Sequence, residues 1–485
     1  MATLNIAFVI NRLGAVEWLS LPVVAALARE RGHRVAFVEY GRNPRKGRRD
    51  LAAFAPDIVA YSVCSNEVDE YLAINHALKQ ELRFFSLFGG AHATYTPPLI
   101  QADGVDAICR GESDLVFPRF LDRFGTDAMY DTPNFSFKLR EKNGALEYRE
   151  NPLTDLVADL DQFPFPARDL VFSKSHFMAH NPIKAFMAGR GCPFSCAHCF
   201  NSAYNRLYKG KGPIMRTKSV GYLLAEIKDV ARRYPLTFVR FHDDVFGFDT
   251  DWLAEFAERF PKEIGLPFSC YAHPRMVNAQ YARLLSRAGC HAVYTAIECG
   301  SERLRKDVLL RPVSNDQIMA VCELFKKEGI RILSFNMIGL PGETEEDIWE
   351  TIRLNQRIGV DFADVSVFQP YPGTNAFEYC REHGYLHEEN SGFRNIYTES
   401  FLNIDAGLRQ RIFVLHKLFA FIVDFPRLSA VSKLIPHTTR LNSLLNLFYR
   451  LYYGFFLHRR IYASSIPLSV RLRGAREVLF SKNRI

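Results

Sequence analysis

The sequence predicts an α/β protein with two regions of parallel sheet and a helical end, and three observations point to this fold. Short apolar runs alternate with helical patterns over residues 1–125, and the same alternation returns after residue 183. A proline-containing segment separates the two regions. A basic segment rich in aromatic residues follows the second. Strands that alternate with helices form parallel sheets through right-handed crossovers.

In the first region, short apolar runs predict strands, as expected for strands buried on both faces. The predicted strands cover residues 6–10, 35–39, 58–63 and 84–88, and the predicted helices cover residues 21–31 and 68–78. We therefore predict a doubly wound, Rossmann-like domain over residues 1–125. Ligands of such domains bind beyond the carboxyl ends of the strands.

The loops expected at those ends carry glycine and polar residues suited to a flat ligand. Glycine pairs allow the backbone to approach such a ligand closely. The candidate binding residues are Asn11, Gly14, Trp18, Ser62, Ser65, Gly89, Gly90, His92, Thr94 and Glu112. Taken alone, a histidine such as His92 is more often an ordinary hydrogen-bonded residue than a ligand.

Residues 126–182 are predicted to be a linker, because closely spaced prolines at residues 161–168 discourage regular structure. Residues 183–390 form the second α/β domain, and residues 391–485 are predicted to be mostly helical. The predicted strands of the second domain lie at residues 184–188, 238–241, 291–297, 331–337 and 364–368.

The first of these strands leads into three closely spaced cysteines, Cys192, Cys196 and Cys199. Thiolates bind iron–sulfur clusters or zinc. Three thiolates leave one iron of a four-iron cluster open to a substrate, whereas a structural zinc site takes four protein ligands. His198 is a candidate fourth zinc ligand, but its place between two cysteines makes a closed tetrahedron awkward. The other seven cysteines lack metal-ligand spacing and are interpreted as small buried hydrophobes.

The Cys-x3-Cys-x2-Cys spacing resembles the radical SAM superfamily. This resemblance implies a [4Fe-4S] cluster that binds S-adenosylmethionine (SAM), a partial (β/α)6 barrel, and cleavage of SAM to methionine and a 5′-deoxyadenosyl radical. His198 departs from the pattern, since an aromatic residue usually precedes the last cysteine, and the change bears on redox tuning more than on the cluster.

Further segments of residues 183–390 resemble elements that surround SAM in this superfamily. Asp243 and Asp244 resemble the segment beside the methionine amino group, although adjacent acids also serve as loop or cap residues. The Glu-Cys-Gly-Ser run resembles the Glu-Ser-Gly-Ser element, and its serine also fits a helix N-cap. The Gly-Leu-Pro-Gly-Glu-Thr run resembles the loop that packs on adenine. The candidates from these two runs are Glu298, Ser301, Gly339, Pro341 and Gly342.

The loops of the first domain resemble the cobalamin-binding domain often fused ahead of a radical SAM barrel. The resemblance rests on Gly-Gly-x-His-x-Thr at residues 89–94 and Gly-Glu-x-Asp at residues 111–114, and the order of the two domains agrees with it. The chain thus resembles the cobalamin (B12)-binding domain-containing radical SAM enzyme family. The loop after the first strand has no histidine, so we expect no protein ligand on cobalt, with Trp18 covering its lower face. A doubly wound domain that binds nothing, or another nucleotide, is the alternative.

The resemblance implies a [4Fe-4S] cluster, SAM and cobalamin as cofactors, and an electron donor such as flavodoxin or ferredoxin. We expect a methyltransferase that acts on an unactivated carbon of a small or lipid-like substrate, since methyl transfer is the commonest outcome in such families. An oxidative cyclase or ring-rearranging enzyme is the second hypothesis, and a non-catalytic cobalamin-binding protein is the third. The sequence identifies neither the substrate nor a catalytic residue.

Positive charge is concentrated in the last segment. The formal net charge is +8, while residues 401–485 hold 14 Lys and Arg against three acids, a net of +11. This segment suits a helix on a membrane surface, a lid over an apolar substrate, or a helix packed on the barrel. Nucleic acid is not expected, because methylthiolating relatives that act on RNA carry a second cysteine set and only Cys64 and Cys109 precede the barrel.

No secretory signal or spanning segment is expected from the sequence, because residues 4–10 already behave as a strand and no apolar run reaches the length of a membrane helix. We therefore expect a cytoplasmic protein. The basic segment leaves open a peripheral contact with the inner face of the membrane.

Overall fold

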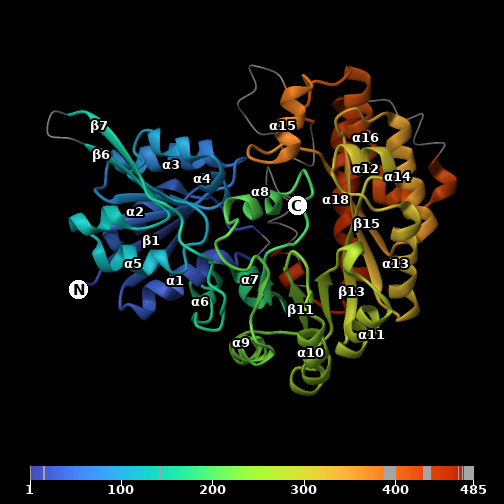
Figure 1. The fold of residues 1–485 in the computed structure, drawn as a ribbon, viewed down its shortest axis with the longest axis horizontal. Helices are drawn as coiled ribbons and strands as arrows, with labels where there is room; N and C mark the ends of the chain where they lie inside the picture. Colours follow the sequence, from blue (N-terminus) through green and yellow to red (C-terminus); the bar gives the residue numbers. More distant parts are fainter. Residues whose placement is uncertain are drawn as a thin grey trace. The chain divides into compact units, whose positions relative to one another are not determined.

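The structure, a computed structural model, describes residues 2–14, 17–140, 144–386, 400–429, 439–467, 469–471 and 473–474 of the 485-residue chain. The chain forms two compact units. The first unit comprises Met1–His180, Arg206–Ile214 and Leu472–Arg484, and the second comprises Asn181–Asn205, Met215–Arg471 and Ile485. Figure 1 labels many of the elements in the two units.

The first unit is built on one sheet with the strand order β2-β1-β3-β4-β5-β6-β7. Strands β1 to β5 are parallel, while β6 and β7 run antiparallel to their neighbours. The strands are β1 Asn5–Ile10, β2 Arg34–Glu39, β3 Ile58–Ser62, β4 Phe85–Gly89, β5 Ala107–Cys109, β6 Phe135–Arg140 and β7 Leu146–Glu150. The predicted doubly wound domain is confirmed.

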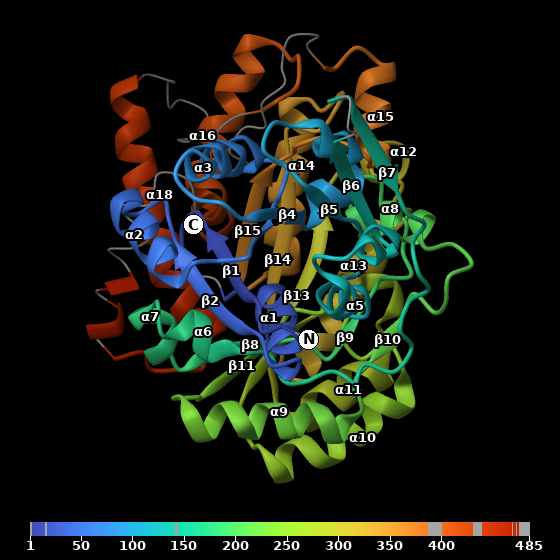
Figure 2. The ribbon, with the colours of Figure 1, turned by 90° about the vertical axis from the view of Figure 1, so that its left-hand side faces the viewer.

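Helices cover both faces of this sheet, as Figure 2 shows. The helices are α1 Ser20–Glu30, α2 Pro44–Phe54, α3 Val68–Lys79, α4 Ala91–Tyr95 and α5 Val116–Arg123. On one face, Leu51 of α2 and Ile74 of α3 join Val9 in a single buried cluster. On the other face, the ring of Phe8 lies 5.3 Å from Phe37 and 6.4 Å from Phe117 of α5.

The predicted linker over residues 126–182 is wrong in part, because β6 and β7 extend the sheet within it. Phe135 and Phe137 of β6 face the ring of Phe120, at 4.7 and 6.2 Å. The prolines of residues 161–168 act only on their own neighbourhood. Two short helices, α6 Arg168–Phe172 and α7 His176–His180, follow them.

The second unit is a partial barrel of six parallel strands in the order β15-β14-β13-β12-β11-β8, which confirms the expected (β/α)6 architecture. Its strands are β8 Ile183–Phe186, β11 Phe238–Phe241, β12 Phe268–Tyr271, β13 Cys290–Glu298, β14 Arg331–Ile338 and β15 Phe362–Val367. Its helices are α8 Phe200–Leu207, α9 Val220–Arg233, α10 Thr250–Glu263, α11 Ala279–Ala288, α12 Glu302–Asp307, α13 Asn315–Lys327, α14 Glu345–Ile358, α15 Asn375–Glu382, α16 Ala406–Asp424 and α18 Thr439–Ile461.

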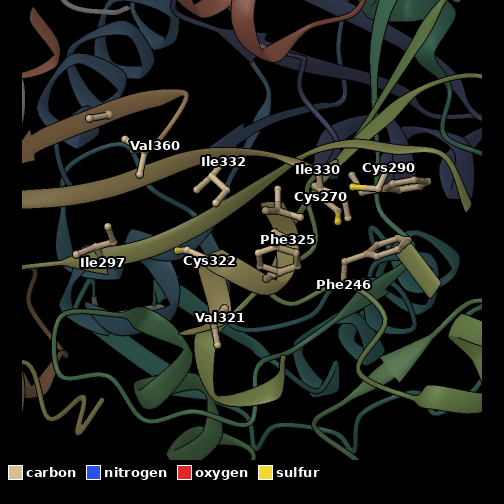
Figure 3. Packing of buried hydrophobic residues seen from close by; sticks show 14 of the residues in the cluster. Phe246, Cys270, Cys290, Ile297, Val321, Cys322, Phe325, Ile330, Ile332 and Val360 are labelled. Atoms are coloured by element: carbon tan, nitrogen blue, oxygen red, sulfur yellow. The ribbon is translucent and has the colours of Figure 1, made fainter. Parts of the chain in front are cut away.

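The main core of this unit lies between the outer face of the sheet and its helices. Figure 3 shows Ile297 and Ile332 of the strands beside Cys322 and Phe325 of α13. A fully buried phenylalanine such as Phe325 contributes about 1.5–3 kcal/mol.

The last helix, α18, packs on the barrel, which is one of the three arrangements predicted for the basic segment. The Tyr453 ring meets Phe362 of β15 edge-on at 5.3 Å, and its hydroxyl lies 3.3 Å from Asp364 Oδ2. Arg460 donates to the carbonyl of Asp361 at 3.1 Å. Exposed apolar side chains remain on the other face of the helix: Leu444, Leu447, Leu451 and Phe455. Within the described residues, none of the helices combines the length and apolarity needed to span a bilayer.

Candidate active site

The loop that carries the three cysteines is fixed at its start and in its middle. Asp243, which follows β11, accepts hydrogen bonds from the amides of Ala188 at 3.1 Å and Gly189 at 2.5 Å. Ala197 donates to the carbonyl of Leu309 at 2.8 Å, and its own carbonyl accepts from Ala376 at 2.9 Å. The residues that hold the loop therefore follow β11, follow α12 and lie in α15.

The sulfur atoms of this loop receive N–H donors from two sides. The amide of Asn201 lies 3.4 Å from Cys199 Sγ, and Arg311 Nη1 lies 3.6 Å from Cys196 Sγ. Such donors favour thiolate ligands and tune iron–sulfur clusters. Burial raises the pKa of Cys192 to about 12 and that of Cys199 to about 11.

The donor set fits a four-iron cluster, in which each thiolate binds its own iron. In the described part of the chain, no three His, Cys, Asp or Glu side chains are gathered around a single ion position. A four-iron cluster does not need three side chains around one ion, because each thiolate binds a different iron. The three thiols, with N–H donors near two of their sulfurs, therefore suit a four-iron cluster.

The two adjacent acids after β11 have different surroundings. Both oxygens of Asp243 are used by backbone amides and its side chain is buried, so it holds the cysteine loop, which differs from the expected cofactor contact. Asp244 is exposed to solvent and close enough to Cys192 and Cys199 to raise their pKa values. Although the side chain is exposed, protein atoms around the carboxyl group partly remove its hydration and raise its own pKa, against a hydrogen bond from Asn201. Asp244 alone is available to a ligand.

Glu298 ends β13 beside the cysteine loop. Its φ of +66° is uncommon for a non-glycine residue and marks a position held by its surroundings. Burial opposes ionisation, but His198, 3.4 Å away, and Arg311, 3.9 Å away, outweigh it and lower the pKa of Glu298. Among the described residues, His198 Nδ1 and Arg311 Nε are buried without hydrogen-bond partners. These two nitrogens and the ionised carboxylate fit a polar ligand such as SAM.

The Gly-Leu-Pro-Gly-Glu loop after β14 folds back on its own glutamate. The amides of Gly339 and Leu340 donate to Glu343, whose pKa burial raises to about 8. Gly339 and Gly342 have φ values of +79° and +72°, which glycine adopts readily. Pro341 is buried between them.

Ser301 is the N-cap residue of α12, as the alternative interpretation predicted, although its side chain makes no capping hydrogen bond. Burial opposes the ionisation of Asp347, but hydrogen bonds from the amide and hydroxyl of Thr344, and a further one from the Ser301 hydroxyl, lower its pKa.

In the first unit, the loops after β3, β4 and β5 form one hydrogen-bonded cluster. His92 Nδ1 lies 3.0 Å from Ser65 Oγ, and Thr94 Oγ1 accepts from the Gly111 amide at 2.9 Å. A Cβ on Gly90, whose φ is +91°, would lie 2.8 Å from the amide nitrogen of Val63 and 2.9 Å from Ser62 Oγ. Burial lowers the pKa of His92. The cluster thus brings Ser62, Ser65, Gly89, Gly90, His92 and Thr94 together.

The other candidate binding residues of the first unit lie outside this hydrogen-bonded cluster. Asn11 donates its side-chain amide to Glu70, Trp18 is half-buried, and a Cβ on Gly14 would meet nothing within 4 Å. That open space beside Gly14 and the glycine-lined edge fit a flat cofactor such as cobalamin. The Glu112 amide donates to Tyr208 Oη at 2.8 Å.

Sequence reasoning missed Tyr208, Asn201 and Arg311. None lies in a motif, and only the fold brings them to the loops that they contact.

Comparison with known proteins agrees with both units. Residues 187–354 match the Radical SAM superfamily and residues 6–121 match the B12 binding domain. An uncharacterised methyltransferase of Pyrococcus horikoshii is 29% identical over 343 residues, 68% of this chain and 70% of the relative. The cytidylyl-2-hydroxyethylphosphonate methyltransferase of Streptomyces wedmorensis is 22% identical over 409 residues, 76% and 74% of the two chains.

Solved structures share the fold. The radical SAM methyltransferase TsrM from Kitasatospora setae, solved with cobalamin and a [4Fe-4S] cluster, has a TM-score of 0.69 at 14% identity, covering 99% of this chain and 100% of that one. The cobalamin-dependent SAM radical enzyme OxsB, solved with aqua-cobalamin, has a TM-score of 0.65 at 13% identity, covering 98% and 75%. With a B12 binding domain followed by a radical SAM barrel, this chain belongs to the radical SAM enzymes that carry a cobalamin-binding domain.

Proposed function

We propose that this chain is a cobalamin-dependent radical SAM methyltransferase that acts on an unactivated carbon of a small substrate. The observation that carries the proposal is the trio of cysteines in one anchored loop, with N–H donors on two of the sulfurs, in a chain that also has a B12 binding domain. The methyltransferases that match more than two thirds of the chain support methyl transfer as the outcome.

When bound, the cluster and SAM supply the 5′-deoxyadenosyl radical, and cobalamin supplies the methyl group. The residues of this chain bind and orient these groups. Cys192, Cys196 and Cys199 would each hold one iron. Asp244 and Glu298 would accept hydrogen bonds from the amino and hydroxyl groups of SAM, and the Gly339–Gly342 backbone would face its adenine.

In the first unit, the candidate residues at the carboxyl ends of β1, β3, β4 and β5 would bind cobalamin. No histidine lies in the described part of the loop after β1, so cobalt would have no protein ligand there, and Trp18 would cover its lower face. The chain would draw electrons from a flavodoxin or ferredoxin.

Anaerobic reconstitution with iron, sulfide and cobalamin tests the proposal. On reduction with SAM, we expect both 5′-deoxyadenosine and S-adenosylhomocysteine by mass spectrometry, since the second product requires methyl transfer. Cys196→Ala should abolish 5′-deoxyadenosine, while Cys322→Ala, which alters a core cysteine of α13, should leave it within about twofold, because the cavity it creates is small. Wild-type protein that forms neither product would refute the proposal.

A cyclase is the second candidate, because the anaerobic magnesium-protoporphyrin IX monomethyl ester cyclase of Rubrivivax gelatinosus is 22% identical over 340 residues. That reaction class would yield 5′-deoxyadenosine without S-adenosylhomocysteine. Product formed from SAM labelled with ¹³C on its methyl group would carry the label only if the chain transfers methyl.

A further inference from the structure

Several side chains on the concave face of the barrel in the second unit remain partly accessible to solvent. On the outer face, Phe241, Cys270 and Ile297 are fully buried. Residues of the opposite face of the sheet, on five of its strands, are partly accessible to solvent. These are Arg240 of β11, Tyr271 of β12, Ala296 of β13, Phe335 of β14, and Asp364 and Ser366 of β15. Two residues of α18 and the chain beyond it, Tyr453 and Tyr462, complete this lining.

Arg240 places a positive charge in this interior without a counter-charge. Its Nε is buried with no hydrogen-bond partner, and across the described ranges its guanidinium makes no ion pair or hydrogen bond. The guanidinium lies over the ring of Tyr462, with Cζ 5.3 Å from the centroid. A guanidinium removed from bulk water normally finds an anionic partner.

Asp364 does not provide that partner. Its oxygens accept hydrogen bonds from the Val365 amide at 2.9 Å and the Tyr453 hydroxyl at 3.3 Å, and burial raises its pKa to about 7. The facing histidines are neutral, since burial lowers the pKa of His242 to about 3 and that of His458 to about 4. Among the described residues, Arg240 is thus a cation without an ion-pair partner.

The surroundings of Arg240 are aromatic. Tyr271 and Phe335 stack at 5.8 Å with an interplanar angle of 5°, and Tyr271 meets Tyr294 edge-on at 4.9 Å. The Tyr294 hydroxyl lies 3.3 Å from that of Tyr462. Aromatic walls with a fixed cation bind an apolar body that ends in an anion.

We propose that Arg240 binds the anionic group of the substrate, a carboxylate or a phosphonate, in a ligand whose apolar part lies against Tyr271 and Phe335. The proposal rests on the proposed function only in taking this ligand to be the substrate. SAM also carries a carboxylate, so the test separates the two sources.

Saturation-transfer NMR on the anaerobically reconstituted full chain tests this, with phenylacetate and phenylphosphonate as probes and phenethylamine as the cationic counterpart. Wild type should bind either anion at least about 10-fold more tightly than the amine, because a charge-assisted hydrogen bond is worth that much. Arg240→Gln should lose this preference and Arg240→Lys should keep part of it. Arg259→Gln, on the outer surface of α10, should behave as wild type.

Two readouts separate a binding role from a structural one. Arg240→Gln should melt at or above the wild-type temperature without probe, because it removes an uncompensated charge. It should also bind SAM as wild type does and still form 5′-deoxyadenosine. A lower melting temperature, weaker SAM binding, or equal anion binding by wild type and Arg240→Gln would overturn the proposal, as would wild-type protein that binds neither anion. If the proposed function is wrong, the wild-type protein will form no 5′-deoxyadenosine, and this result does not depend on whether the probes bind.

Discussion

At the scale of single residues, Arg311 links the cysteine loop to Glu298 and is the residue most directly placed to tune a cluster. Its Nη1 donates to Cys196 Sγ, and its Nη2 donates to the Ala296 carbonyl at 2.8 Å. A hydrogen bond to a ligand sulfur stabilises the extra electron of a reduced cluster.

Arg311→Met should therefore make the reduction potential of the reconstituted cluster more negative, while Arg311→Lys should shift it less because the charge remains. An anaerobic redox titration followed by electron paramagnetic resonance measures this. Arg353→Met, whose arginine pairs with Glu346 at 2.6 Å on the surface of α14, is the control. An unchanged potential in Arg311→Met would contradict the assignment.

Glu343 gives a pH-dependent prediction. Its folded pKa of about 8 lies above its ordinary value of 4.5, so the folded chain keeps a proton that the unfolded chain loses. The stabilisation is complete below pH 4.5 and disappears as the pH rises through 8. Gln can replace the oxygen that accepts from Gly339 and Leu340 without titrating.

Glu343→Gln should therefore gain stability relative to wild type between pH 5 and pH 8, by at most about 1.4 kcal/mol per pH unit. Calorimetric melting at several pH values measures the difference. A difference that does not change with pH would show that Glu343 is ionised in the folded chain.

Residue-scale sequence reasoning located the cysteine loop but not the roles of its neighbours. Asp243 and Asp244 are adjacent in a loop, and only the fold shows that the first binds the amides of Ala188 and Gly189. The contact of Arg311 with Cys196 joins residues 115 positions apart, and neither side chain signals it in the sequence.

At the scale of elements, the segment after α8 packs against a glycine loop within the first unit. Gly111 has a φ of +70°, and a Cβ there would lie 2.0 Å from the Tyr208 hydroxyl oxygen. Gly125 has a similar φ of +81°, but a Cβ there would meet nothing within 4 Å. Substitutions at these two glycines therefore distinguish the cost of backbone strain from the cost of steric overlap.

Gly111→Ala should destabilise the first unit by about 3 kcal/mol or more, because strain adds to the loss of the hydrogen bond between the Glu112 amide and Tyr208. Gly125→Ala should cost only the strain, about 1–2 kcal/mol. Urea unfolding measures both. Equal losses would mean that the Tyr208 contact contributes nothing.

The sequence predicted most strands of the two large sheets, because their apolar runs are clear. It missed β5 and β12, which are only three and four residues long, and it missed β6 and β7, which lie in the segment interpreted as a linker. It left three arrangements open for α18, because an apolar and basic helix has the same composition on a membrane and on a barrel.

At the scale of the whole molecule, the two compact units give a test of where cobalamin acts. A ligand that binds only folded protein stabilises the unit that holds it, by about 2.7 kcal/mol at 100 times its Kd. In calorimetry of the full chain, cobalamin should raise the melting transition of the first unit and leave that of the second unchanged. A shift confined to the second unit would place cobalamin elsewhere.

The family and the order of the domains could be predicted because they rest on local spacing, in the cysteine loop and in the glycine loops of the first unit. The substrate could not, because the groups that line the barrel interior come from five strands and from α18. Arg240 and Tyr462 are 222 positions apart, and no local pattern joins them.

The position of α18 and of the chain after it affects the end of the barrel from which a ligand can enter. Arg460, Tyr462 and the Ser464 hydroxyl, which lies 2.7 Å from Thr237 Oγ1, pass beneath the amino ends of the strands. These contacts cover the amino ends of β11 and β15. We therefore expect a molecule that binds Arg240 to enter from the cysteine side, before SAM binds there, so that steady-state kinetics follow a compulsory order with excess SAM acting as a dead-end inhibitor.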